Sequence, residues 1–370
     1  MIYKMGELFC GAGGLAYGAK QANAETKGEK FSIKHVWAID NDLDSCLTFR
    51  RMITPNKPGV VRHSDIRDID FSELPNADAI AFGFPCNDFS VVGQGKGLKG
   101  KYGPLYRFGV MAIEAQGPKW FIAENVGGIR SNNGGETFKK ILNEFAKAGV
   151  GYNLTVNKYK FEDYGVPQAR HRYIIVGMKK DLNILFMTPA PITKNKNVSA
   201  KQALEIPPIN INICNNEKTK QSPIVIERLK YIRCGENAWN ANLPNHLKLN
   251  VKTARLSHIY RRLHPDKPSY TITGSGGGGT HVYHWAELRA LTNRERARLQ
   301  TFPDDFVFEG SKESVRRQIG MAVPPRGIEI IFEAILKTFA RIPYKHINPS
   351  YDFKNPKMDQ YDLPITVRDS

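Results

Sequence analysis

The chain has 370 residues, of which 41% are hydrophobic and 24% charged, a globular composition that excludes wholesale disorder. Its 53 lysines and arginines outnumber its 36 acidic residues, and the resulting net charge of +17 favours nucleic acid over a membrane as partner. At about 150 residues per domain, two to three domains are expected. No apolar run approaches the ~20 residues that span a bilayer, and the five cysteines form no Cys-x-x-Cys pair. We therefore expect a cytoplasmic protein with reduced thiols, no metal site and no membrane contact.

Short apolar runs alternate with amphipathic segments over the first 178 residues. The runs that favour strands are Met5–Phe9, Ile33–Ile39, Ala77–Phe82, Trp120–Ala123 and Tyr173–Val176. The segments that favour helices are Leu15–Ala24, Asp42–Met52, Leu105–Ala115 and Glu136–Ala148. This alternation predicts an α/β fold in which crossover helices join the strands of a parallel sheet.

The composition and periodicity of the sequence change after this region. Residues 179–262 are rich in Asn, Pro and Lys, and they hold 15 basic against 5 acidic residues. We interpret them as a separate binding module, with a long decorated loop as the alternative. A helix is predicted over Leu291–Gln300, and the α/β pattern returns over Val315–Thr338. After residue 343 a polar tail without periodicity is expected to be extended or partly disordered.

A glycine-rich segment joins the first strand to the first helix. Gly11, Gly13 and Gly14 allow a tight turn and a close approach to a ligand at a helix N-terminus. Asp40 ends the second strand, where an acid can hydrogen-bond a ribose diol, and Phe9 offers a ring that can stack on adenine. A nicotinamide or flavin enzyme would also fit, as would a plain tight turn, although the adjacent Gly13 and Gly14 depart from G-x-G-x-x-G.

Cys86 follows an apolar strand and Pro85, at the edge where parallel sheets place their sites. A thiolate there is a strong nucleophile, whereas a buried structural cysteine is the alternative. The next segment, from Gly93 to Gly103, interleaves five glycines with three lysines. That composition indicates a mobile cationic loop able to close over a phosphate backbone, which favours the catalytic interpretation.

Further polar residues lie near the ends of other strands. Glu124 follows an apolar strand, and Asp65 either reaches an adenine amino group or caps a helix. Alternation along an extended segment points Gln168, Arg170 and Arg172 to one side. An exposed face of salt-bridging arginines is the alternative for this last group.

In this order, the motifs resemble those of the cytosine-5 DNA methyltransferases over most of residues 5–327. The resemblance rests on Phe9–Gly14, Asp40, Asp65, Gly83-Phe-Pro-Cys86, Glu124-Asn-Val126, Gln168-x-Arg-x-Arg172, Arg289–Asp304 and Gln318–Pro324. It implies a Rossmann-like S-adenosylmethionine-dependent methyltransferase domain over 1–178 and 302–342. It also implies a smaller, mostly irregular or β target-recognition domain over 179–301, followed by a polar C-terminal tail over 343–370.

The resemblance implies methyl transfer from S-adenosyl-L-methionine to C5 of a cytosine flipped out of double-stranded DNA, through a covalent bond between Cys86 and C6. Glu124, held protonated in a poorly solvated pocket, would act at N3. Arg172 would contact O2, and Arg170 would support the nucleophile's loop. The implied cofactor contacts are Phe9, Gly11, Gly13, Gly14, Asp40, Asn41, Asp65, Ile66 and Leu105. The implied DNA contacts are Ser90, Thr271, Gly276 and Gly277, although the glycine run could equally be a flexible linker.

Two residues depart from the family pattern. Asn87 stands where the family has glutamine, and Met321 follows Gly320 where the family has asparagine near the cofactor pocket. Methionine fills space but lacks the donors of an amide. The residues considered as base readers are Arg228, Arg233, Lys252, Arg255, Arg261 and Arg262.

The resemblance also implies a biological setting. We expect a monomer in the cytoplasm of a bacterial or archaeal host, associated with the nucleoid, that protects DNA in a restriction–modification system. A cognate endonuclease would act on the same site without direct contact. Three alternatives remain open. The substrate could be RNA, although the four residues from Asn87 fit the DNA-methylating branch of the family better. The protein could also be a non-catalytic DNA-binding module, which would not need both Cys86 and Glu124, or a nicotinamide oxidoreductase.

Overall fold

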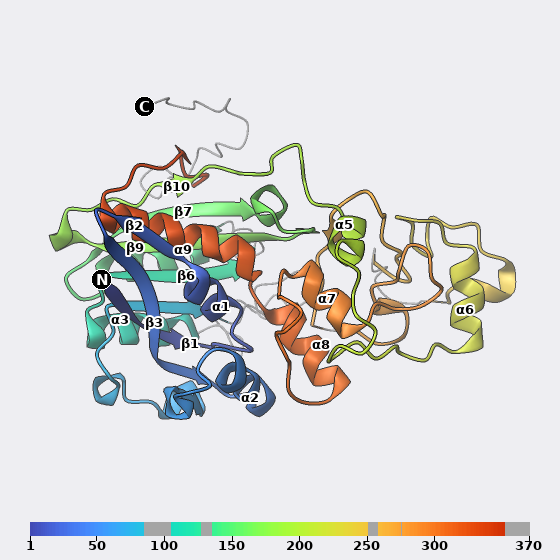
Figure 1. The fold of residues 1–370 in the computed structure, drawn as a ribbon, viewed down its shortest axis with the longest axis horizontal. Helices are drawn as coiled ribbons and strands as arrows, with labels where there is room; N and C mark the ends of the chain where they lie inside the picture. Colours follow the sequence, from blue (N-terminus) through green and yellow to red (C-terminus); the bar gives the residue numbers. More distant parts are fainter. Residues whose placement is uncertain (85–104, 127–134, 251–257, 275, 352–370) are drawn as a thin grey trace. The chain divides into compact units, whose positions relative to one another are not determined.

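The computed structural model describes residues 1–84, 105–126, 135–250, 258–274 and 276–351 (Figure 1). The chain forms two compact units. Unit 1 comprises 1–160, 171–191 and the chain from 327 onward, and unit 2 comprises 161–170 and 192–326. Unit 2 thus takes in 302–326, which we expected in the catalytic domain. Every helix among the described residues is too short or too polar to cross a bilayer.

An eight-stranded sheet is the framework of unit 1. Its order is β2-β3-β1-β5-β6-β9-β7, and β4 pairs with β3 beyond the short pairing of β2. The strands are β1 (Ile2–Leu8), β2 (Asn23–Thr26), β3 (Glu29–Asp40), β4 (Val61–His63), β5 (Ala79–Gly83), β6 (Trp120–Val126), β7 (Tyr152–Lys160) and β9 (His171–Lys179). A separate two-stranded ladder joins β10 (Thr188–Pro189) to β12 (His346–Ile347).

The sheet is parallel in its centre and antiparallel at both sides, since β2 runs antiparallel to β3. Strands β4, β3, β1, β5 and β6 run parallel, whereas β9 runs antiparallel to both β6 and β7. We predicted a parallel sheet, and the structure differs from it in the directions of β2 and β9. The sequence patterns did not reveal β2, nor β7, which is the outer neighbour of β9. The chain crosses over through α4 (Glu136–Lys147) to β7 and then returns directly as β9 between β6 and β7, which requires the antiparallel direction.

Helices cover both faces of this sheet (Figure 1). They are α1 (Gly14–Gln21), α2 (Leu43–Met52), α3 (Tyr106–Gln116), α4, and α9 (Pro325–Ala340), which enters unit 1 at residue 327. The buried apolar residues of α4 are spaced three and four apart, as expected of an amphipathic helix: Phe138, Ile141, Leu142 and Phe145. On the opposite face, Phe332 of α9 packs on Trp120 with ring centroids 5.9 Å apart.

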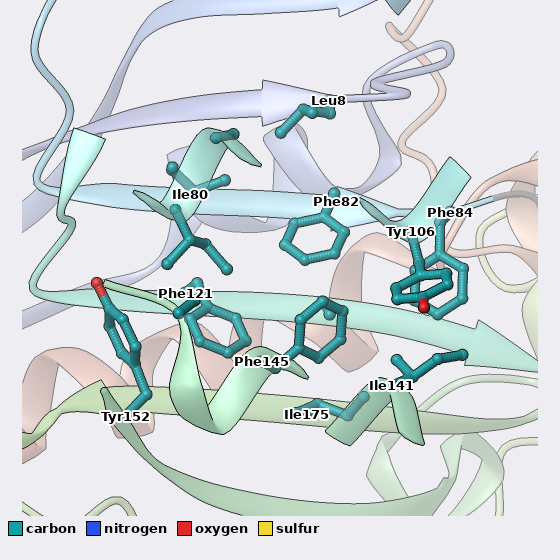
Figure 2. Packing of buried hydrophobic residues seen from close by; sticks show 14 of the residues in the cluster. Leu8, Ile80, Phe82, Phe84, Tyr106, Phe121, Ile141, Phe145, Tyr152 and Ile175 are labelled. Carbon is teal, nitrogen blue, oxygen red and sulfur yellow. The ribbon is translucent and has the colours of Figure 1, made fainter. Parts of the chain in front are cut away.

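The main core lies between α3, α4 and the sheet, and its centre is aromatic (Figure 2). Phe145 packs edge-on against Phe82 and Phe121, with ring centroids 5.5 and 5.6 Å apart. At the border of the cluster, the Tyr152 hydroxyl donates to the carbonyl of Pro118 at 2.7 Å, which satisfies its polar group inside the core. This packing fixes the positions of β5 and β6, whose carboxyl ends carry the polar residues discussed below.

The sequence patterns predicted most of these elements. The five predicted strands are confirmed as β1, β3, β5, β6 and β9, and the four early helices as α1 to α4. The short strands β2 and β4 were not predicted. The segment after residue 343 is more ordered than expected over its first part, because Tyr351 is buried and packs edge-on against Phe138 at 5.3 Å.

Unit 2 contains little regular structure. Among its described residues, its α-helices are α5 (Ala200–Glu205), α6 (Pro223–Lys230), α7 (Asn293–Leu299) and α8 (Lys312–Met321), and a short ladder pairs β8 (Gln168–Ala169) with β11 (Ser269–Tyr270). Buried arginines connect its loops through backbone carbonyls. The guanidinium of Arg262 donates to the carbonyls of four residues, namely Leu229, Ile232, His284 and Trp285. Arg294, which is fully buried, similarly bonds Cys214, Pro303 and Phe306.

We expect Gly320→Ala to destabilise unit 2. A Cβ at residue 320 would lie 2.1 Å from backbone atoms of Thr273 and Gly274, which a side-chain rotation cannot relieve. The free energy of unfolding, measured by urea denaturation, should fall by about 3 kcal/mol. The matched control is Gly277→Ala, because nothing lies within 4 Å of a Cβ there. Equal losses in the two variants would contradict this explanation.

Candidate active site

The carboxyl ends of the central strands lie at one edge of the sheet. Leu8 at the end of β1 is in register with both Ile39 and Phe82, and Gly83 at the end of β5 is in register with Glu124. The residues that follow β1, β3, β5 and β6 therefore start from neighbouring positions. In open α/β sheets, this edge beside the reversal of strand order is where ligands bind.

The glycine-rich turn after β1 has a strongly left-handed backbone. Phe9, Gly11 and Gly13 have φ angles of 54°, 51° and 90°. A Cβ on Gly13 would lie 2.8 Å from the Ile53 side chain, so the turn needs glycine there for space as well as for conformation. A Cβ on Gly11 would meet nothing within 4 Å, so the turn is open on that side. Helix α1 begins at Gly14 without a side-chain cap, which leaves its first N–H groups for a ligand.

Asp40 connects this turn to the start of α2. Its Oδ2 accepts a hydrogen bond from the Gly11 N–H at 2.8 Å, and its Oδ1 accepts one from the Asp42 N–H at 2.9 Å. Burial raises the pKa of Asp40, and the two N–H donors oppose that shift. Each carboxylate oxygen retains acceptor capacity, so the side chain can both support the turn and receive hydroxyl donors.

The other cofactor-contact candidates differ in what their side chains do. Asp65 caps the short 3-10 helix Ile66–Asp68 and pairs with Arg67, with its Oδ2 2.5 Å from Nη2. Ile66 is buried in the main core, so only its main chain is left for a ligand. The exposed Asn41 presents its carbonyl to the ring of His63 at 3.2 Å. Leu105 packs partly buried against the main core just before α3.

The ion pair between Glu124 and Arg172 is the main polar feature at the end of β6. Their Oε1 and Nε atoms are 2.8 Å apart, and both side chains are 13% exposed. The antiparallel β6–β9 register brings them together, since Val126 lies opposite Arg172. The Glu124 carboxyl is poorly solvated, as expected, and the group in contact with it is the Arg172 guanidinium. A Cβ on Gly83 would lie 3.2 Å from Glu124 Oε2, so glycine keeps the space beside the carboxylate open.

Asn125 ties the end of β5 to the end of β6. Its Nδ2 donates to the carbonyl of Phe84 at 3.3 Å, and both residues are buried. Phe84 stands two residues before Cys86, so this bond fixes the chain just ahead of the expected nucleophile. Cys86 itself, Ser90 and the glycine- and lysine-rich segment lie outside the described residues.

Two other cysteines near this edge are unsuited to nucleophilic chemistry. Cys10 is buried, and burial raises its pKa well above the ordinary value. Burial likewise raises the pKa of Cys46 to about 12. Their thiols stay protonated at neutral pH, which leaves Cys86 as the cysteine that the sequence motif favours.

Gln168 and Arg170 organise unit 2. The buried Gln168 amide donates to Gln300 Oε1 at 3.0 Å and accepts from the Ile272 N–H at 2.9 Å. Arg170, also buried, donates through Nη1 to the carbonyls of Ile272 and Gly320 at 3.1 and 3.2 Å. Its described hydrogen bonds therefore connect the residues beside β11 to the end of α8.

The expected DNA-contact residues that are described also lie in unit 2. The Thr271 hydroxyl donates to the Ala169 carbonyl at 2.7 Å. Gly276 lies close to Arg316, whose Cδ would be 3.2 Å from a Cβ added at residue 276. Gly277 faces open space, and its N–H donates to the Thr280 hydroxyl at 3.0 Å.

For two of the arginines considered as base readers, the prediction is wrong, because their side chains are buried. Arg262 is buried and bonded to carbonyls as described above, and Arg228 is buried with its Nε on the Leu247 carbonyl at 2.9 Å. Arg261 lies over the Tyr270 ring at 4.7 Å. Arg233 is exposed, while Lys252 and Arg255 lie outside the described residues.

A buried pair beneath the glycine-rich turn was not predicted. Glu7 in β1 is fully buried and lies 2.8 Å from the ring Nε2 of His35 in β3. Burial raises the pKa of Glu7, and the contact with His35 opposes the shift. An acid inside an otherwise apolar strand was the available signal, but only the β1–β3 pairing identifies its partner.

A second unpredicted group lies in unit 2. Arg296 in α7 is 1% exposed, and its Nη2 is 3.3 Å from Nδ1 of the buried His281. Burial lowers the pKa of Arg296 to about 10, so it remains a cation at neutral pH. Burial, together with the charges of Arg296 and Arg316, lowers the pKa of His281 to about 4.

Comparisons with known proteins show which family this chain resembles. The family model described as C-5 cytosine-specific DNA methylase matches residues 3–337. The chain is 55% identical over 369 residues to the Type II methyltransferase M.BbvI of Brevibacillus brevis, covering 97% of this chain and 98% of that protein. It is 41% identical over 347 residues to the Type II methyltransferase M.NgoFVII of Neisseria gonorrhoeae, covering 91% and 87%. A prophage-encoded protein of Escherichia coli, described as a DNA modification methyltransferase, has a similar fold, with a TM-score of 0.67 at 24% identity over 91% and 99% of the two chains.

The depressed pKa of His281 predicts a loss of stability in acid. Between pH 6.5 and about pH 4 the unfolded chain binds a proton that folded His281 does not, so the free energy of unfolding falls as the pH falls. His281→Gln should remove roughly 2 kcal/mol of the difference between pH 7 and pH 4.5, measured by urea unfolding in phosphate-free buffer. Parallel pH profiles for the two proteins would rule out this source of acid sensitivity.

Proposed function

The chain belongs to the C-5 cytosine-specific DNA methylase family, and from that membership we propose that it methylates C5 of a flipped-out cytosine at a specific site in double-stranded DNA. The single structural observation that carries the proposal is the Glu124–Arg172 pair. Glu124 lies opposite Gly83 at the end of β5, and Cys86 follows Gly83 by only a few residues in the sequence. An acid and a guanidinium 2.8 Å apart match two neighbouring polar atoms on one edge of a cytosine, N3 and O2.

The chemistry requires the target base outside the helix, because the faces of its ring are covered in the stack. The Cys86 thiolate bonds to C6, which places electron density on C5. C5 then accepts the methyl group, a base removes the C5 proton, and elimination releases the thiolate and restores the ring. The covalent bond and the flipped base are part of our proposal for this chain.

Glu124 and Arg172 would stabilise the base during attack by the thiolate. A proton held between the Glu124 carboxyl and N3 neutralises the charge that develops on the ring. For this, Arg172 has to shift part of its hydrogen bonding from Glu124 to O2 as the base enters. Asn125 would support this arrangement by fixing Phe84 ahead of the nucleophile.

The turn after β1 fits S-adenosyl-L-methionine, which supplies the methyl group as a sulfonium electrophile when bound. The open Gly11, the uncapped start of α1 at Gly14 and the Asp40 carboxylate provide space, N–H donors and ribose acceptors. Further contacts in the proposal are the Phe9 ring and the Asn41, Asp65, Ile66 and Leu105 positions. Arg67 leaves part of the acceptor capacity of Asp65 for an adenine amino group.

We further propose that unit 1 carries the chemistry and that unit 2 binds the target DNA, with Ser90 of unit 1 and Thr271, Gly276 and Gly277 of unit 2 near the substrate. Arg170 would act as a positioning residue, because its described hydrogen bonds hold Ile272 and Gly320. The two relatives are named Type II methyltransferases. That name supports a protective role beside an endonuclease of the same specificity, and the monomer stays our default expectation.

Cys86→Ser should abolish methyl transfer, because a serine hydroxyl is a far weaker nucleophile toward C6 at neutral pH. Unmethylated genomic DNA is incubated with the protein and S-adenosylmethionine and read by bisulfite sequencing. We expect protected cytosines in one short sequence context with the unchanged protein and with the control Cys214→Ser, an exposed cysteine of unit 2. Protection by the Cys86 variant would disprove the covalent mechanism, and modification of tRNA but not DNA would change the substrate.

Glu124→Gln should lower kcat by about a hundredfold or more, because an amide cannot hold the proton at N3. Its carbonyl oxygen can still accept from Arg172, so the cofactor Kd measured by calorimetry should stay within about twofold of the original. Glu114→Gln on the exposed surface of α3 is the matched control. A loss confined to cofactor affinity would show that Glu124 has a different role.

A further inference from the structure

A small cationic cavity lies in unit 2, between α7, α8 and the residues around His281. It is lined by Glu217, Thr219, His281, Leu291, Asn293, Arg296, Lys312 and Arg316. Its volume of about 10 Å³ holds one water-sized atom. Three of its lining side chains carry positive charge, and a single acid, the exposed Glu217, accompanies them.

The two arginines of this cavity have unsatisfied donors. The Nε atoms of Arg296 and Arg316 are buried, and neither has a hydrogen-bond partner among the residues that the structure describes. Arg296 is 1% exposed, and its one described contact inside the cavity is with His281. Arg316 is 14% exposed and lies 3.7 Å from Glu313, a carboxylate that is itself 80% exposed. The Lys312 ammonium donates to the Lys218 carbonyl at 2.9 Å.

This arrangement is costly without an anion. Buried charges are ordinarily paired, and each buried N–H left without an acceptor loses the hydrogen bond that water would supply. Here two guanidiniums repel each other, and each lowers the pKa of His281, which is neutral at pH 7. Glu217 and Glu313 are at the exposed rim, and the remaining described acid that acts on Arg296, Glu295, is paired with Arg289. An anionic oxygen in the cavity would accept from the free donors and offset the repulsion.

The adjacent loop leaves room for a polyanion. A Cβ on Gly276 would lie 3.2 Å from Cδ and Nε of Arg316 and 3.6 Å from Nδ1 of His281, so glycine lets the backbone lie directly on the cavity. A Cβ on Gly277 would meet nothing within 4 Å. An extended anion can therefore approach this side without meeting a side chain from either glycine.

We propose that this cavity binds one non-bridging oxygen of a phosphate group in the DNA backbone, through Arg296 and Arg316. The inference rests on the proposed function, which makes DNA the substrate. A cavity with room for one oxygen atom does not admit a base, so the contact positions the DNA and carries no sequence information. It would anchor the strand beside Gly276 and Gly277, in the part of unit 2 expected to contact DNA.

The first test measures DNA affinity against salt for Arg316→Gln. Losing one phosphate contact should reduce the slope of log K against log salt by about one, and weaken specific and nonspecific DNA about equally, by roughly tenfold at 0.1 M salt. Arg317→Gln removes the same charge from an exposed neighbour on α8 and should change the slope by much less. Equal slopes for the two variants, or a loss restricted to the specific sequence, would overturn the proposal.

A second test uses inorganic phosphate alone and does not require DNA binding. Phosphate should raise the Tm of the unchanged protein, and Arg316→Gln should remove that shift. Glu217→Gln should strengthen both phosphate and DNA binding, because it removes the competing acid from the rim. Destabilisation of the free protein by Glu217→Gln, without a gain in binding, would identify Glu217 as the occupant instead.

The two tests separate this inference from the proposed function. A phosphate-dependent Tm shift in a protein that neither binds nor methylates DNA would contradict the proposed function and make free phosphate the occupant. DNA methylation with no effect of Arg316→Gln on the salt slope or on the phosphate shift would leave the proposed function standing and reject the cavity as an anion site.

Discussion

The hydrogen-bonded register between the parallel strands determines where the candidate active-site residues of this protein lie. Because β1 is aligned with both β3 and β5, and β5 with β6, the residues after Leu8, Ile39, Gly83 and Glu124 start at one edge of the sheet. A shift of one residue in any strand would turn its last side chain to the opposite face. The aromatic core around Phe145 prevents such a shift, since it packs on β5 and β6 together.

The same edge uses hydrogen bonds to hold its irregular segments. Asp40 accepts from the backbone of the glycine-rich turn, and Asn125 donates to the carbonyl of Phe84. Both side chains bind main-chain atoms of a different strand end, so each connects two segments that are far apart in sequence. Turns with left-handed residues such as Phe9 and Gly13 are strained or entropically costly alone, and these contacts fix their conformation.

The positive charge of the chain has two different uses in unit 2. Arg228, Arg262 and Arg294 are buried, and their guanidiniums bind backbone carbonyls of loops and element ends. A planar group with five donors suits this purpose in a region with little regular structure. Net charge therefore overstates the cationic surface available to DNA. Arg296 and Arg316 differ from this group because buried donors in both remain unsatisfied.

The sequence by itself determined the alternation of strands and helices, the glycine-rich turn, and the acids Asp40 and Glu124 at strand ends, because these depend on local periodicity and on residue type. It also gave the order of motifs that identifies the family. Only the tertiary structure decided the antiparallel direction of β9, the pairing of Glu124 with Arg172, and the burial of Arg262. The partners in these contacts are separated by tens of residues along the chain, and no local pattern encodes which distant atom a charged side chain meets. The Glu7–His35 pair and the Arg296–His281 contact were hidden for the same reason.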